Sequence, residues 1–221
     1  MQAAILLNKK KVSVATPADL SITFDNATVG DKTIIDQSAN ARVFTRATMG
    51  GSAGDGVVND PTFGMCYKFD GYSYFNCTNP LQFSKGNYRL EMDFVTKQTT
   101  YGVPFRSGDY SAHGVQQGLC IILNQTAGDY FQCFFTNTLT YQRIYFTPET
   151  NPGPTVLEKM VITKQGNTIT IKNNRTGVQS SGTLSFTQNA DSYLALGVSD
   201  ALTTAYSFVG LLKRLEIFLL P

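Results

Sequence analysis

The fold is decided by a stretch of regular alternation, which reads Tyr88-Arg89-Leu90-Glu91-Met92-Asp93-Phe94. Its even positions hold large, mainly apolar side chains, and its odd positions hold charged ones. Successive side chains of a β-strand point to opposite faces of a sheet, whereas a helix needs apolar residues three or four positions apart. The stretch therefore predicts a strand that buries one face in a core and leaves the other face polar.

The rest of the chain has the composition of an all-β protein. Apolar residues make up 42% and charged residues only 15% of its 221 residues, with 19 glycines, 11 tyrosines and 15 phenylalanines. This composition is too apolar for a disordered chain and too poor in charge for a coiled coil. Short apolar runs separated by Gly, Asn, Asp and Pro recur from Ser21 onward, which is typical of a sandwich or barrel.

Charge and hydropathy exclude two classes of partner. The formal net charge is +2, and the basic residues are scattered apart from Lys9-Lys10-Lys11, so we expect no binding to nucleic acid. No apolar run reaches the roughly 18–20 residues that a membrane-spanning helix needs. The apolar run at residues 3–7 is short and precedes its lysines, the wrong order for a signal peptide. We expect a soluble protein made in a cytoplasm, although a cleaved signal would leave no trace in this sequence.

The chain is expected to hold one domain behind a short arm. Residues 1–16 contain an apolar run and the lysine run and end at Pro17, which marks a break. We expect this segment to be an arm that docks on a partner, or an added strand. Residues 17–221 are then long enough for a single large domain.

Two dipeptides predict tight turns, and the closing residues predict a central strand. Gln165-Gly166 predicts a hairpin in which Ile162 faces Ile169, and Asp70-Gly71 predicts a second hairpin between the runs that flank it. In residues 208–219 one of the two alternating rows is almost wholly apolar. A strand with such a row is expected in the middle of a sheet.

The cysteines are expected to be free thiols. There are four, Cys66, Cys77, Cys120 and Cys133. Cys120 and Cys133 flank two apolar runs in a spacing that predicts they lie opposite each other, and a disulfide between them is the alternative. Directly opposed cysteines make a strained bridge, and a cytoplasm keeps thiols reduced. The cysteines lack the spacing of a zinc site and His113 is the single histidine, so we expect no metal and no other cofactor.

Taken in order, several segments resemble a concanavalin A-like jelly-roll domain of the laminin-G type. They are 22–25, Ile35-Asp36-Gln37-Ser38-Ala39-Asn40, 64–75, 88–95, 164–168, and Leu196-Gly197 followed by 208–218. The resemblance spans roughly residues 20–219 and lies in the order and spacing of the segments. It implies an antiparallel jelly-roll sandwich of two sheets. In that family one sheet, or the loops at one end, binds sugars, proteins or calcium.

Enzymes that resemble this family carry their carboxylates on one strand in the pattern Glu-x-Asp-x-x-Glu. Retaining glycoside hydrolysis needs one carboxyl group to attack and a second to donate a proton. Glu91 and Asp93 match the first two positions, but Thr96 stands at the third, and its hydroxyl cannot donate a proton at neutral pH. We therefore expect no enzyme, and we interpret Glu91 and Asp93 as solvated residues of a sheet face.

The sequence suggests one sugar site and, less specifically, calcium ligands. Sugars are held by aromatic rings together with groups that hydrogen-bond, and such residues gather in Tyr101, Arg106, Asp109, Tyr110, Tyr141 and Arg143. The same residues are also ordinary at the rim of a sandwich. Calcium-binding relatives use loop aspartates, for which Asp31, Asp36 and Asp109 qualify by position alone. Local hydrogen bonds within turns are the favoured interpretation of these aspartates.

From these expectations we predict a non-catalytic binding module of a bacteriophage virion, made in the host cytoplasm. By analogy with other domains of this kind it would be a tail-fibre, baseplate or head-decoration protein that binds host-surface glycans. Its arm would dock on other virion proteins or on copies of itself. Two alternatives stay open, namely a divergent glycan hydrolase whose acid comes from another strand, and a structural protein with no ligand.

Overall fold

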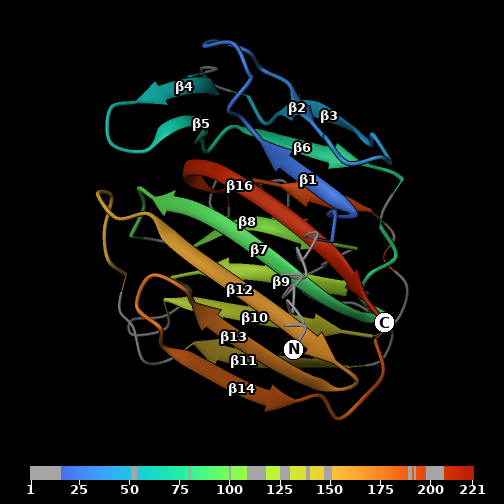
Figure 1. Ribbon diagram of the computed structural model, residues 1–221. Helices are drawn as coiled ribbons and strands as arrows, with labels where there is room; N and C mark the ends of the chain where they lie inside the picture. The colour runs from blue at the N-terminus through green and yellow to red at the C-terminus, as the bar shows by residue number, and fades with distance from the viewer. Residues whose placement is uncertain are drawn as a thin grey trace, which may run out of the picture.

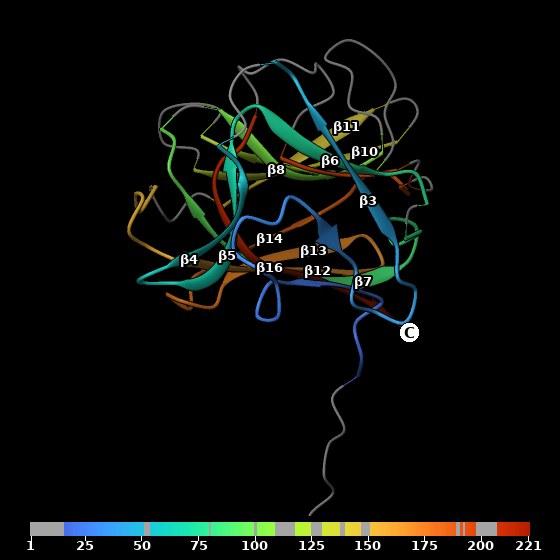
Figure 2. The same ribbon diagram turned by 90° about the horizontal axis from the view of Figure 1, so that it is seen from above.

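The chain folds into two antiparallel sheets that pack face to face (Figure 1, Figure 2). The computed structural model describes residues 16–50, 54–79, 81–99, 101–108, 118–124, 130–137, 140–146, 151–188, 191, 193–197 and 207–221. These residues form strands and turns but no helix, and hence none that could cross a membrane. The predicted all-β, two-sheet jelly-roll sandwich is confirmed. The predicted arm lies outside the described residues except for Thr16.

One sheet, here called the β7 sheet, has the order β14-β13-β12-β7-β16-β5-β4, with β1 paired to β16. Its strands are β1 Leu20–Thr23, β4 Gly56–Asp60, β5 Gly64–Asp70, β7 Asn87–Thr96, β12 Glu158–Gln165, β13 Thr168–Asn173, β14 Gln179–Thr183 and β16 Val209–Leu220. The β8 sheet has the order β11-β10-β9-β8-β15-β6-β3-β2. Its strands are β2 Ile34–Ile35, β3 Val43–Thr48, β6 Ser73–Cys77, β8 Gly102–Ser107, β9 Gly118–Leu123, β10 Phe131–Thr136, β11 Tyr141–Phe146 and β15 Leu194–Leu196.

The core lies between the two sheets, and β7 contributes to it as the alternation predicts. Its even-numbered side chains from Tyr88 to Phe94 are fully buried among the apolar residues of both sheets. Phenylalanines from the β8 sheet, such as Phe105 and Phe131, meet them from the other side. Burying a large apolar side chain stabilises a fold by about 2 kcal/mol, so this layer is the main source of stability.

Strand β16 is central, as predicted, because it pairs with β7, β5 and β1. Its two rows do not keep to one face each, since a β-bulge interrupts the pairing with β7 between Leu212 and Arg214. Leu211 therefore lies on the outer face with Cys66. Leu212, Leu215 and Ile217 enter the core. A bulge adds one residue to one strand and so reverses the order of its faces.

Both predicted hairpins differ in the structure. The turn between β12 and β13 lies at 166–167, one residue later than expected, so that Ile162 faces Ile171 and not Ile169. Gly166 fits this turn because its φ of 55° is in the left-handed region. At Asp70-Gly71 no hairpin forms, because β5 belongs to the β7 sheet and β6 to the β8 sheet. This turn is a corner where the chain crosses from one sheet to the other.

Cys120 and Cys133 are not opposite each other, which corrects the register expected from the sequence. Cys120 pairs with Phe134, and Cys133 pairs with Ile121. A slip of one residue sends neighbouring side chains to opposite faces. Cys133 consequently lies in the core and Cys120 on the outer face of the β8 sheet, and neither forms a disulfide, nor do Cys66 and Cys77.

Candidate functional site

The candidate site is the outer face of the β8 sheet, the face turned away from the β7 sheet. Hydrogen-bonded register aligns Arg106 of β8 with Cys120 of β9, and Cys120 with Phe134 of β10. Phe134 in turn aligns with Arg143 of β11. These side chains form one row across four strands, so the two arginines lie about 14 Å apart by strand spacing.

Aromatic rings orient the two arginines of this row. The Arg106 guanidinium lies 4.8 Å from the centre of the Tyr193 ring. The Arg143 guanidinium lies 4.3 Å from the Phe134 ring and 5.5 Å from the Tyr141 ring. A guanidinium held flat on a ring keeps the N–H groups at its edges directed away from that ring.

Four of the six residues predicted for a sugar site belong to this face. Arg106, Tyr141 and Arg143 stand on its strands, and Tyr101 packs against the small apolar cluster of Val103, Cys120, Ile122 and Phe134 at its centre. Asp109 and Tyr110 lie outside the described residues. The structure thus brings together residues from β8, β11 and the segment before β8, and their role in binding stays a prediction.

Sequence reasoning missed two residues of the same face, Gln132 and Tyr145. They are paired across β10 and β11, and Tyr145 is 38% exposed while Gln132 is 1% exposed. Neither amide atom of Gln132 has a hydrogen-bond partner. A lone polar residue within the apolar run 130–135 was the available signal, because such a residue is either paired or functional.

On the outer face of the β7 sheet, by contrast, five charged side chains form ion pairs with one another. Arg214 of β16 lies 3.1 Å from Glu91, 3.2 Å from Asp93 and 3.0 Å from Glu216. A second arginine, Arg89, lies 2.9 Å from Glu91. Thr96 is buried, and its hydroxyl donates to the Gln98 carbonyl. Glu91 is therefore held in a network of ion pairs, and no second carboxyl group stands at residue 96.

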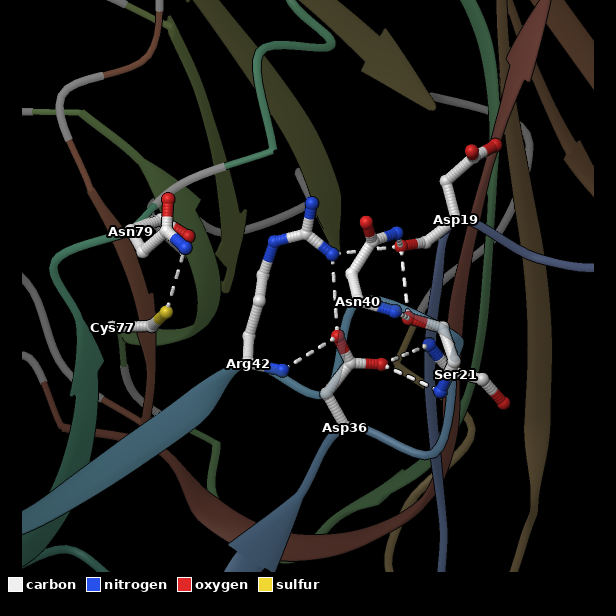
Figure 3. A network of polar contacts seen from close by, with 8 residues as sticks. Asp19, Ser21, Asp36, Asn40, Arg42, Cys77 and Asn79 are labelled. Atoms are coloured by element: carbon white, nitrogen blue, oxygen red, sulfur yellow. Dashed lines mark hydrogen bonds and ion pairs between the residues drawn. The ribbon is translucent and has the colours of Figure 1, made fainter.

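The carboxylate of Asp36, one of the calcium candidates, is occupied by hydrogen bonds and an ion pair within the protein (Figure 3). Its carboxylate accepts hydrogen bonds from the backbone amides of Ser21, Ser38 and Arg42 at 3.0, 2.9 and 3.2 Å. The Arg42 guanidinium is 3.2 Å from the same carboxylate and also donates to the Asp19 carbonyl. Burial raises the pKa of Asp36, but these backbone hydrogen bonds outweigh it and hold the pKa below its ordinary value.

The Asp36 network fixes the segment after β2 against β1, which is a structural role. Asp31, the second calcium candidate, accepts from the Thr28 amide at 3.1 Å within its own turn. Asp109 lies outside the described residues. Within the described ranges no three His, Cys, Asp or Glu side chains are grouped so that they could hold a metal ion.

A third polar cluster joins the two sheets. Arg46 of β3 makes two hydrogen bonds of 2.7 Å to Asp55, and the Tyr67 hydroxyl of β5 donates to the same carboxylate at 2.6 Å. Burial raises the pKa of Asp55, but Arg46 and Tyr67 more than offset this and hold it well below its usual range. All three side chains have partners, so this cluster clamps the sheets and leaves nothing for a ligand.

Comparisons with known proteins agree with the fold. No protein-family model and no curated protein sequence matches the chain. Domain 4 of AbnA, a GH43 extracellular arabinanase from Geobacillus stearothermophilus, is similar with a TM-score of 0.66 and 18% identity, over 92% of this chain and 94% of that one. That structure is a complex with arabinotriose.

Two further solved structures are similar. The binding domain of botulinum neurotoxin DC in complex with SialylT has a TM-score of 0.61 and 12% identity, over 93% of this chain and 48% of that one. This chain therefore spans about half the length of that binding domain. The Ruminococcus gnavus IT-sialidase CBM40 bound to alpha2,3 sialyllactose has a TM-score of 0.50 and 12% identity, over 62% and 79% of the two chains. At such identities the likeness shows the fold alone.

The Asp36 network predicts a pH-dependent cost of replacing this residue. Asp36→Asn should lower the free energy of unfolding at pH 7 by about 3 kcal/mol, because it removes the buried charge that pairs with Arg42. The folded pKa lies below the unfolded value of about 3.9, so the native stabilisation is present above that value and is lost as pH falls through the folded pKa. The cost should therefore shrink below about pH 4. Denaturant unfolding at several pH values measures it, and Asp31→Asn is the control, with a change within about 0.5 kcal/mol. A cost independent of pH would contradict the assigned charge.

The Arg214 network predicts that Glu91 is dispensable for chemistry. Glu91→Gln should change the free energy of unfolding by less than about 1 kcal/mol, because partly exposed ion pairs contribute little. The unaltered protein should release no reducing sugar from β-glucans or bacterial surface polysaccharides. Release of reducing sugar that Glu91→Gln abolishes would establish the hydrolase instead.

Proposed function

We propose that this chain is a non-catalytic module that binds glycans on the outer face of the β8 sheet. The observation that carries the proposal is the strip of Tyr141, Arg143 and Tyr145 along the edge strand β11, beside the unsatisfied amide of Gln132. Tyr141 is 61% exposed and Tyr145 is 38% exposed. An exposed ring offers an apolar surface to the C–H face of a sugar, while its hydroxyl and the neighbouring polar groups bond to sugar hydroxyls.

The energetics of Gln132 favour a ligand over a purely structural role. A buried polar group without a partner costs about 1 to 3 kcal/mol, and native proteins contain few of them. An amide offers both a donor and an acceptor, which matches the hydroxyl groups of a sugar. Gln132 is itself 1% exposed, so it lies beneath this strip and the exposed rings of Tyr141 and Tyr145 make the first contact with a glycan.

The similar structures support this proposal through their ligands. The arabinanase domain is described with arabinotriose, and the sialidase module with sialyllactose. This fold therefore carries sugar sites in other proteins, although the residues that bind must be identified on each chain separately. On the outer face of the β7 sheet, by comparison, Arg89, Glu91, Asp93, Arg214 and Glu216 are engaged in ion pairs with one another.

A glycan array followed by calorimetry tests the proposal. We expect binding to at least one glycan, and we expect Tyr141→Ala and Tyr145→Ala each to weaken it about tenfold, because aromatic side chains dominate such contacts. Tyr72→Ala is the matched control, since Tyr72 is 41% exposed but lies at the corner between β5 and β6. An array without any bound glycan would favour the structural alternative.

The setting that we propose is the one the sequence suggests, a tail-fibre, baseplate or head-decoration component of a phage particle. Residues 1–16 would dock on other virion proteins or on a second copy, and the β8 sheet would face the host surface. We expect tail or capsid genes beside the gene for this chain, and the chain itself in purified particles analysed by mass spectrometry. A gene neighbourhood of polysaccharide-degrading enzymes would overturn this setting while leaving glycan binding intact.

A further inference from the structure

The seven arginines of the chain fall into two groups. Five are paired with carboxylates, namely Arg42, Arg46, Arg89, Arg175 and Arg214. In the part of the chain that the structure describes, Arg106 and Arg143 have no carboxylate partner and contact aromatic rings instead. Both exceptions lie on the outer face of the β8 sheet, in one register row.

The distribution of carboxylates explains why these two arginines are different. None of the eight strands of the β8 sheet contains an aspartate or a glutamate. The strands of the β7 sheet contain six, namely Asp60, Asp70, Glu91, Asp93, Glu158 and Glu216. The strands of the candidate site thus present positive charge and no negative charge of their own.

Arg106 is the more unusual of the two because it is almost completely buried. The residue is 3% exposed, and neither Nε nor Nη1 of its guanidinium has a hydrogen-bond acceptor. Removing a charge from water without a partner is costly, and proteins normally pair such a charge. Arg143 of the same row is only half-buried and lies on an edge strand. An anionic group on a ligand that binds Arg143 would bring negative charge to this positively charged row.

We infer that the glycan bound by this face is acidic, with a carboxylate or a sulfate group that the half-buried Arg143 binds between the exposed rings of Tyr141 and Tyr145. This inference rests on the proposed function and adds the chemical class of the ligand. The Phe134 and Tyr141 rings hold the Arg143 guanidinium in place, so little side-chain freedom is lost when the anion binds. The exposed rings of Tyr141 and Tyr145 then contact the uncharged part of the sugar. Arg106, which is buried, adds a second positive charge at the far end of the row.

Matched pairs of sugars test the inference. The probes are 3′-sialyllactose, 3′-sulfolactose and lactose, together with trigalacturonic acid and its carboxyl-reduced counterpart, measured by calorimetry. We expect the acidic member of at least one pair to bind about tenfold more tightly than its neutral partner. The sialyl and sulfo arms show which anion is preferred. Higher salt should reduce the preference, because ions screen the attraction between charges.

Two variants and one control locate the effect. Arg143→Gln should remove most of the preference for the acidic sugar while neutral binding remains, and Arg106→Gln should reduce it less because the buried charge acts from a distance. Arg143 is on an edge strand, so its variant keeps the test valid if Arg106→Gln does not fold. Arg89→Gln makes the same change on the outer face of the β7 sheet and should leave both affinities unchanged.

The outcomes separate this inference from the proposed function. Equal binding of acidic and neutral partners would overturn the acidic class and keep a glycan-binding module. A preference that persists in both arginine variants would place the anion elsewhere and overturn the role of Arg143. Binding of none of the probes, with an empty glycan array, would overturn both proposals.

Discussion

The pairing of β16 with β7 and β5 is the constraint on which the rest of the structure depends. β16 also bonds to β1, so the last strand of the chain holds the first described strand and two strands from its middle. Gly210 permits this position, because a Cβ there would lie 2.2 Å from the Val95 carbonyl oxygen. The strands of the β7 sheet can pair only when these distant segments meet. The inner face of the paired sheet then supplies half of the core.

This constraint also divides the polar chemistry between the sheets. On the β7 sheet the bulge at β16 directs Arg214 to the outer face, where it meets carboxylates from β7 and from its own strand. Where the sheets meet, Asp36 and Asp55 are each paired with an arginine and accept further hydrogen bonds. Charges in these places stabilise the fold. The outer face of the β8 sheet differs, since among the described residues Arg106 and Arg143 have no carboxylate partner and the buried Gln132 amide has no hydrogen-bond partner.

Groups that a fold leaves unsatisfied are informative about function because they have a cost. Packing can replace a buried amide or charge with an apolar residue at little loss, so a group kept without a partner is a reason to propose a ligand where exposed side chains stand beside it. The fold alone would not have located the site, since the same sandwich serves proteins with different ligands. The site that we propose rests on the position of Arg106, Gln132 and Arg143 on one face, together with the exposed tyrosines beside them.

Local sequence determined which residues form strands and which of their faces are buried. The alternation in β7 and the apolar row of β16 identified two central strands, and a cluster of tyrosine and arginine residues in loop-like or strand-end sequence pointed to Arg106, Tyr141 and Arg143 as candidates. Only the tertiary structure decided which strands pair and in which register. A shift of one residue separates Cys120 from Cys133, a bulge reverses the faces of β16, and Asp70-Gly71 is a corner between sheets although its sequence is that of a hairpin. The physical reason is that alternation fixes the two sides of a strand, whereas register and partner depend on contacts between segments far apart in the chain.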